Sequence, residues 1–96
     1  MIGVVATLKV ADGKAEAFET AFLALAAQVR ANEPGCLAYQ LTRSRTEPGI
    51  YKVLELYRDE ESLKAHGQSA HLHAAGPALM PCMGGPPVIE YLDAVE

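Results

Sequence analysis

The chain has 96 residues, half of them hydrophobic, which suits one globular domain over residues 1–96. Twelve acidic residues against eight basic ones give a net charge of −4, which excludes the basic surface that nucleic-acid and anionic-membrane binding require. No apolar run approaches the roughly 20 residues of a membrane span, and the N-terminus does not resemble a signal peptide. We therefore expect a cytoplasmic protein in which Cys36 and Cys82 are reduced thiols.

The first half of the chain predicts a strand followed by an amphipathic helix. Residues 2–10 alternate with period two, and because both faces are largely uncharged, we expect this strand to be covered on both sides. From residue 14 to residue 32 the apolar positions recur at steps of three and four, which is typical of one helix face. Pro34 and Gly35 end this helix. The predicted core positions of the helix are Ala15, Phe18, Phe22, Leu25, Ala26 and Val29.

The second half predicts a hairpin, a broken helix and a last strand. Residues 36–45 and 50–58 alternate on either side of a Glu-Pro-Gly turn, as in a β-hairpin. An acidic helix start follows at Asp59, and Gly67 is expected to break this helix before Ser69 caps a second piece. We expect Gly76 and Pro77 to interrupt this second piece, and residues 76–87, which contain four of the six prolines, to form a loop that can include a short helical turn. Residues 88–92 are expected to form a strand.

The predicted element order is βαββαβ, which indicates an α+β ferredoxin-like fold. Its four-stranded antiparallel sheet would carry helices on one face only. The first strand is nevertheless apolar on both faces, and the third alternates Leu54 and Leu56 with Val53 and Tyr57. An exposed apolar sheet face of this size marks an interface. The pattern therefore predicts a homodimer that packs sheet against sheet into a barrel-like assembly.

Three histidines, His66, His71 and His73, lie within eight residues. His71 and His73 are two apart, so on a helix they point in nearly opposite directions. Their spacing matches no zinc pattern and no second ligand cluster is present, so we expect no metal site. Each histidine is either a surface or helix-end residue or part of a pocket.

Glu55 lies in the middle of an otherwise apolar strand. A carboxylate in such a place is either paired with a cation, here Arg43, Arg45 or Lys52, or placed in a pocket where burial raises its pKa. Tyr57 shares its strand face, and Tyr39 lies on the neighbouring strand. Tyrosines beside a carboxylate and a histidine can line a cleft for a flat organic ligand, although tyrosines are also ordinary sheet residues.

Two stretches of the chain resemble the antibiotic biosynthesis monooxygenase family of the dimeric α/β barrel superfamily. One is the segment Glu33-Pro34-Gly35-Cys36-Leu37-Ala38-Tyr39. The other runs from Leu54 to His66 and continues with Ser69-Ala70-His71. The resemblance implies a homodimer with one pocket per subunit between sheet and helices. It also implies oxidation of a small quinol-like or polyphenolic aromatic by O₂, with no metal, flavin or other cofactor.

In such a reaction the substrate supplies the electrons, and the protein removes a proton and orients the substrate. The resemblance implies His66 and His71 as the recurring histidines, one of which acts as the base, with Glu55 as its orienting partner or as a regulator of the anion. Two alternatives stay open, an isomerase or tautomerase that uses the same pocket and a non-catalytic dimer that binds small molecules. The expected substrate-binding residues are Tyr39, Tyr57, Val53 and Leu63.

Overall fold

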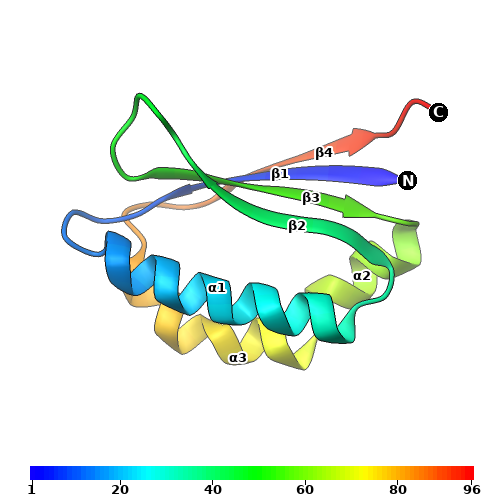
Figure 1. Cartoon of the computed structure of the whole chain (residues 1–96), viewed down its shortest axis with the longest axis horizontal. Helices are drawn as coiled ribbons and strands as arrows, with labels where there is room; N and C mark the ends of the chain where they lie inside the picture. Colours follow the sequence, from blue (N-terminus) through cyan, green and yellow to red (C-terminus); the bar gives the residue numbers. More distant parts are fainter.

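The computed structural model describes residues 1–96 as a four-stranded antiparallel sheet with helices on one face. The sheet order is β2-β3-β1-β4, so the two central strands are the first and third along the chain (Figure 1). This arrangement confirms the predicted ferredoxin-like α+β fold. The elements are β1 (Ile2–Lys9), α1 (Ala15–Asn32), β2 (Cys36–Arg43), β3 (Ile50–Tyr57), α2 (Glu60–Gly67), α3 (Ala70–Leu79), the short 3₁₀ helix η1 (Met80–Cys82) and β4 (Val88–Asp93).

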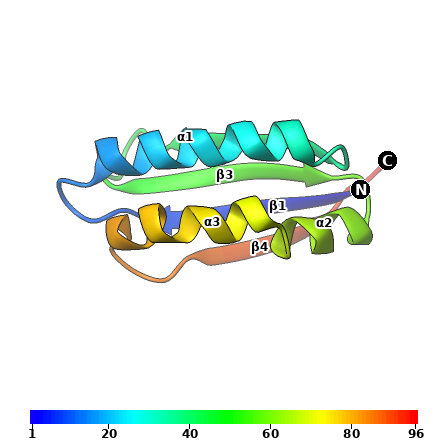
Figure 2. The same cartoon turned by 90° about the horizontal axis from the view of Figure 1, so that it is seen from below.

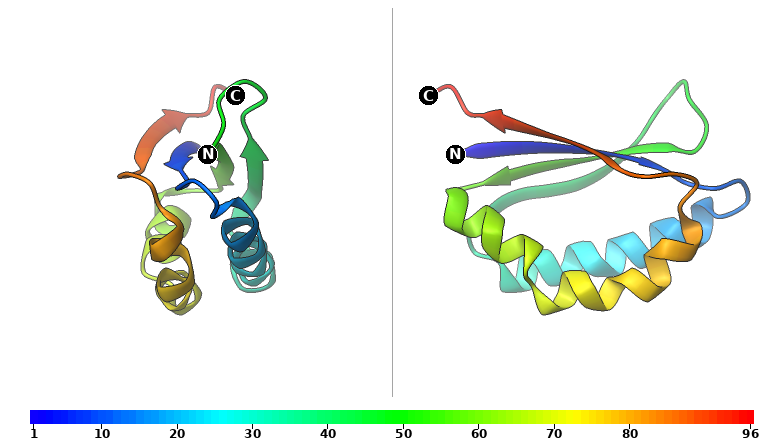
Figure 3. Two further views of the ribbon diagram at one scale, coloured as in Figure 1. Left: turned by 90° about the vertical axis from the view of Figure 1, so that its left-hand side faces the viewer. Right: turned by 180° about the vertical axis from the view of Figure 1, so that it is seen from behind.

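The helices form two rows under the sheet. Figure 2 shows α1 along one side, under the edge that holds β2 and β3, and α2 with α3 along the other side, under β1 and β4. The end-on view in Figure 3 shows both rows on the same side of the sheet. None of the helices combines the length and the apolar character that crossing a bilayer requires.

The alternation of the strands divides the sheet into a helix-facing side and an open side. On β3, Tyr51, Val53 and Tyr57 are at most 2% exposed and face the helices, whereas Leu54 is 45% exposed on the opposite side. The register carries this division across the sheet, because Val4 and Tyr39 both lie opposite Glu55. We use the term open face for the apolar side chains of the uncovered side, which are Val5, Leu54, Leu56, Val88 and Leu92.

The helix α1 supplies one wall of the core. Its buried residues repeat at helical spacing, and they confirm the predicted face at every position except Ala15, which is exposed at the first turn. The rings of Phe18 and Tyr51 pack with centroids 4.8 Å apart, and those of Phe22 and Tyr39 stack at 5.7 Å. Helix and sheet are thus joined by aromatic contacts. The buried residues of α1 are Phe18, Phe22, Leu25, Ala26 and Val29.

The second helical segment breaks where the sequence predicts, but it extends further than expected. Asp59 caps α2 by accepting from the Ser62 N–H, α2 ends at Gly67, and Ser69 caps α3 by accepting from the Leu72 N–H. The expected interruption at Gly76 and Pro77 is wrong, because α3 continues to Leu79. Pro77 lies in the last turn, where a missing N–H removes only one bond of the ladder.

Candidate active site between sheet and helices

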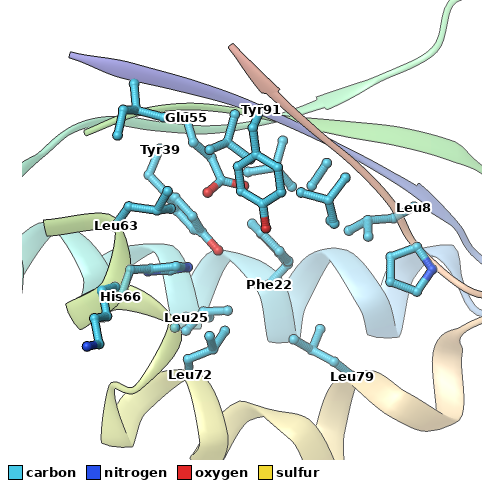
Figure 4. A pocket seen from close by; sticks show the side chains of 18 of the residues that line it. Leu8, Phe22, Leu25, Tyr39, Glu55, Leu63, His66, Leu72, Leu79 and Tyr91 are labelled. Atoms are coloured by element: carbon cyan, nitrogen blue, oxygen red, sulfur yellow. The ribbon is translucent and has the colours of Figure 1, made fainter. Parts of the chain in front are cut away.

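A cavity of about 1020 Å³ lies between the helix-facing side of the sheet and the two helix rows. Seventeen of its 24 lining residues are hydrophobic, which is typical of sites for small organic molecules. Polar groups enter it from both layers. Figure 4 shows Glu55, Tyr39 and Tyr91 reaching in from the strands and His66 reaching in from α2.

Glu55 is held in this cavity by a tyrosine. The hydroxyl group of Tyr57, itself fully buried, donates a hydrogen bond of 2.6 Å to Oε1 of Glu55. Burial raises the pKa of the Glu55 carboxyl above its usual range, and the hydrogen bond from Tyr57 and the nearness of His66 oppose this effect in part. Glu55 makes no ion pair with Arg43, Arg45 or Lys52. The structure therefore supports the interpretation that Glu55 lies in a pocket, rather than in an ion pair.

His66 lines the cavity and is 8% exposed. Its ring lies between two tyrosines, with centroid distances of 5.3 Å to Tyr39 and 5.4 Å to Tyr57. Its Nδ1 atom is 3.0 Å from both carboxylate oxygens of Glu33. Because an ionised carboxylate only accepts hydrogen bonds, we assign the ring proton to Nδ1, which leaves Nε2 with a free lone pair.

Glu33 joins both candidate histidines. Its Oε2 atom also makes a short contact with Nε2 of His71, so one carboxylate bridges two imidazole rings. The side chain of Glu33 is 9% exposed, that of His66 is 10% exposed and that of His71 is 16% exposed. Glu33 makes no ion pair with any lysine or arginine. It has the position that the sequence analysis expected for Glu55, that of the carboxylate beside the histidines.

The structure brings most of the predicted site residues to the cavity. Glu55, His66, Tyr39, Val53 and Leu63 all line it. The two exceptions are Tyr57 and His71, which do not line it. Tyr57 is buried behind Glu55, and His71 lies instead in a second, shallow groove of about 520 Å³ between α1 and α3.

Sequence reasoning missed Glu33 and Tyr91. Glu33 belongs to the motif that carried the family resemblance, so the motif contained the signal, but its contacts lie 33 and 38 residues away in sequence. Tyr91 alternates toward the helix-facing side of β4, opposite Val4, and this parity could have identified it.

The electrostatic environment of the site keeps the hydroxyl group of Tyr39 protonated. Burial, together with the carboxylates of Glu55 and Glu33, raises the pKa of Tyr39 well above its usual range, so its hydroxyl keeps its proton. The same causes raise the pKa of the nearby Cys36 thiol to about 11, so this cysteine is a poor nucleophile. No three His, Cys, Asp or Glu side chains are grouped so as to hold a metal ion.

The chain is similar to known proteins in both sequence and fold. The family model described as antibiotic biosynthesis monooxygenase matches residues 1–78. A crystal structure from Caulobacter crescentus CB15, named as a putative antibiotic biosynthesis monooxygenase, is 66% identical, covers 99% of this chain and 90% of that chain, and has a TM-score of 0.96. A conserved protein from Methanosarcina mazei Go1 is 30% identical over 95% of this chain and 89% of that chain, with a TM-score of 0.87.

A third structure shows the fold alone. It comes from Nitrosomonas europaea and carries the same family name; it is 23% identical over all of both chains, with a TM-score of 0.90. No curated protein matches the chain. The match of the family model over most of the sequence, together with the Caulobacter structure, shows that this chain belongs to the antibiotic biosynthesis monooxygenase family.

Proposed function

We propose that this protein is a cofactor-independent monooxygenase that oxidises a small, neutral, quinol-like or polyphenolic aromatic with O₂ inside the cavity. The observation that carries the proposal is the placement of His66. Its Nδ1 atom is held by Glu33 while its ring lines an apolar cavity, so Nε2 is available to remove a proton from a bound phenol.

The size and charge of the cavity support the substrate class. Its volume of about 1020 Å³ is at the upper end of the range of roughly 300–1,000 Å³ that is common for small-molecule sites. Three acidic side chains line it, Glu55, Glu60 and Asp93, against the single basic residue Lys64. An anionic substrate would be repelled by this lining, so a neutral aromatic fits best.

The proposed reaction balances without a further reductant. The phenolic proton passes to Nε2 of His66, and the resulting anion transfers one electron to O₂. Superoxide and the substrate radical then combine to form a carbon–oxygen bond. His66 returns the proton to the peroxide, and loss of the carbon-bound hydrogen with cleavage of the O–O bond releases water. For 1,4-dihydroxynaphthalene the products are 2-hydroxy-1,4-naphthoquinone and one water.

Glu55 and the tyrosines would position the substrate. The free oxygen of the Glu55 carboxyl can accept from a substrate hydroxyl, and Tyr39 and Tyr91 offer further hydroxyl groups in the same space (Figure 4). Water-poor surroundings strengthen such interactions. The chain thus supplies a base and hydrogen-bonding groups, while the electrons come from the substrate.

We further propose that the protein is a homodimer formed by packing the open face of one subunit against that of another. Val88 is 66% exposed on this face, and Leu54 and Leu92 are each 45% exposed. Both rows of helices lie on the other side of the sheet (Figure 3). Because the same apolar patch is present on every copy, a two-fold arrangement can bury it, as the family resemblance implies.

The function is tested by O₂ uptake with 1,4-dihydroxynaphthalene, corrected for oxidation without enzyme. We expect the wild-type protein to accelerate uptake and to incorporate one atom of ¹⁸O₂ into 2-hydroxy-1,4-naphthoquinone. His66→Ala should lower kcat by about 10²–10⁴-fold, the range of general-base catalysis. His73→Ala is the matched control, because His73 is exposed on α3 and should leave kcat unchanged.

Two results would contradict the proposal. Equal rates for wild type and His66→Ala would remove His66 from the chemistry. Uptake at the uncatalysed rate across a panel of hydroquinones and anthrones would remove the monooxygenase function, and turnover of a dienol under strict anaerobiosis would favour an isomerase in its place.

A further inference from the structure

We propose that Glu33 is the positioning residue of the site: it fixes the protonation geometry of His66, and His71 holds the Glu33 carboxylate from the other side. The contact that carries this inference is the bridge from one carboxylate to Nδ1 of His66 and to Nε2 of His71. Its mechanistic part rests on the proposed function, in which Nε2 of His66 is the base.

Three elements meet at this bridge. Glu33 follows the last residue of α1, and its backbone N–H donates to the Val29 carbonyl at 2.9 Å. His66 lies near the end of α2, and its carbonyl accepts 2.7 Å and 3.1 Å hydrogen bonds from the Ser69 hydroxyl and backbone N–H. His71 is the second residue of α3. The carboxylate is therefore fixed by its backbone and by both helices that flank it.

The low exposure of Glu33 makes its contacts with the two imidazoles important. With its side chain 9% exposed, Glu33 has lost most of its hydration, and the two imidazoles replace it as hydrogen-bond donors. A carboxylate beside Nδ1 selects the tautomer with the proton on that atom, and it stabilises the imidazolium that forms when Nε2 takes up a proton. His71 occupies the second oxygen, so the carboxylate cannot turn away from His66.

Other charged and titratable groups around His66 do not duplicate this role. Tyr39 and Tyr57 flank the ring as aromatic neighbours, and Glu55 forms its hydrogen bond with Tyr57 rather than with His66. Lys64 lies on the same helix as His66 and lines the cavity without forming an ion pair. Glu33 is thus the carboxylate that can set the state of the base.

The first test does not depend on activity. The ¹⁵N chemical shifts of the two ring nitrogens of His66 report which one carries the proton. In the wild-type protein at a pH where the ring is neutral, we expect Nδ1 to be protonated and Nε2 to be bare. In Glu33→Ala we expect the Nε2-protonated form, which predominates in free histidine, to become the major one. Glu61→Gln, a change at an exposed residue of α2, should leave the shifts unchanged.

A second variant keeps the test decisive if Glu33→Ala does not fold. Oε1 of Glu33 contacts His66, and Oε2 contacts both His66 and His71. In Glu33→Gln one of these oxygens becomes an NH₂ group, which donates and meets a ring nitrogen in either orientation of the amide. We therefore expect at least one of the two histidines to change tautomer. Unchanged tautomers of both rings in the folded variant would overturn the inference.

Kinetics separate this inference from the proposed function. If the protein turns over hydroquinones, Glu33→Gln should lower kcat at least tenfold with little change in KM, and it should add little to the loss caused by His66→Ala. A loss of equal size in both backgrounds would contradict the positioning role. If no hydroquinone is turned over but Glu33→Ala reverses the His66 tautomer, the geometry stands and the proposed chemistry fails.

Discussion

Two partly buried carboxylates with different partners define the chemistry of the site. Glu33 is hydrogen-bonded by the imidazoles of His66 and His71, whereas Glu55 accepts from the hydroxyl of Tyr57. The partners set the roles that we propose, since imidazoles couple Glu33 to the base and the tyrosine leaves the second oxygen of Glu55 open to the cavity. The two carboxylates are therefore not interchangeable.

The environment of Glu55 predicts how stability depends on pH. Burial raises the pKa of its carboxyl, so the folded protein holds this proton more tightly than the unfolded chain. The stability linked to this proton is complete below the unfolded pKa of about 4.3 and is lost as the pH rises through the folded pKa. Glu55→Gln stays uncharged and escapes that loss.

Urea unfolding across a pH series measures this effect. The free energy of unfolding of Glu55→Gln minus that of the wild type should increase from about pH 4 upward and then level off. Glu61→Gln, at an exposed position, should show no such pH-dependent rise. A difference for Glu55→Gln that is constant or falls with pH would show that burial does not raise the pKa of this carboxyl.

The parts of the candidate site that depend on strand alternation or on local spacing along a helix were predictable from the sequence. The alternation of β3 places Val53 and Glu55 on the face that bears Tyr57, and the break at Gly67 separates His66 from His71. The bridge by Glu33 was not predictable in this way, because it depends on how three chain segments converge. Tyr57 was predicted to bind substrate but does not line the cavity. The alternation of a strand predicts which face of the sheet a side chain lies on, but it does not predict whether that side chain reaches the cavity or is covered by its neighbours.

At the scale of the elements, the connection from α1 to β2 fixes where α2 can lie. Gly35 is buried, and a Cβ atom there would be 2.1 Å from Oγ and 2.6 Å from Cβ of Ser62. The carbonyl of Gly35 also accepts from the Arg58 N–H at 2.9 Å. The glycine therefore lets the start of α2 approach the start of β2, which brings His66 to Glu33.

Replacing this glycine should separate the two elements. We expect Gly35→Ala to lower the free energy of unfolding by about 1–3 kcal/mol, the usual cost of overpacking, as measured by urea denaturation. In a Ser62→Gly background the clashing atoms are absent, so the same change should cost much less.

Gly76→Ala is the matched control, because a Cβ at this helical position meets nothing within 4 Å. It should be neutral or slightly stabilising, since alanine favours a helix. If Gly35→Ala proved equally harmless, the close packing of α2 against β2 would be refuted.

The order and type of the elements followed from the sequence more securely than their ends. Period-two and helical spacing identified β1, β2, β3 and α1, whose buried residues lie on one face. The strand β4 was also expected, although all of its residues are exposed. Proline and glycine were weaker guides near the end of α3. Gly76 and Pro77 predicted a helix break, yet the helix continues past them to Leu79. A proline in the last turn removes only one hydrogen bond of the helix, so it does not have to end the helix.

At the scale of the whole molecule, one layer of helices leaves half of the sheet uncovered. The proposed homodimer predicts a mass in solution of twice the 10.2 kDa of one chain by light scattering. Leu54→Asp would place an unpaired charge in the buried interface, at a cost of several kcal/mol, so we expect a monomer or an unfolded chain. Leu23→Asp makes the same change on an exposed position of α1 and should leave the mass and the fold intact.

These outcomes are distinguishable. A wild-type protein that stays a monomer at high concentration would contradict the dimer directly. A dimer that tolerates Leu54→Asp as well as it tolerates Leu23→Asp would mean that the subunits associate through another surface.

The claim on which the account depends most is that a neutral aromatic binds beneath the sheet, against His66. An anaerobic titration with 1,4-dihydroxynaphthalene, followed by NMR of leucine methyl groups, tests it directly because binding is observed without turnover. We predict that Leu8, Leu63 and Leu72, which line the cavity, shift with saturation, while the exposed Leu23 and Leu37 do not. Shifts confined to the exposed leucines, or no saturable shift at all, would contradict the account.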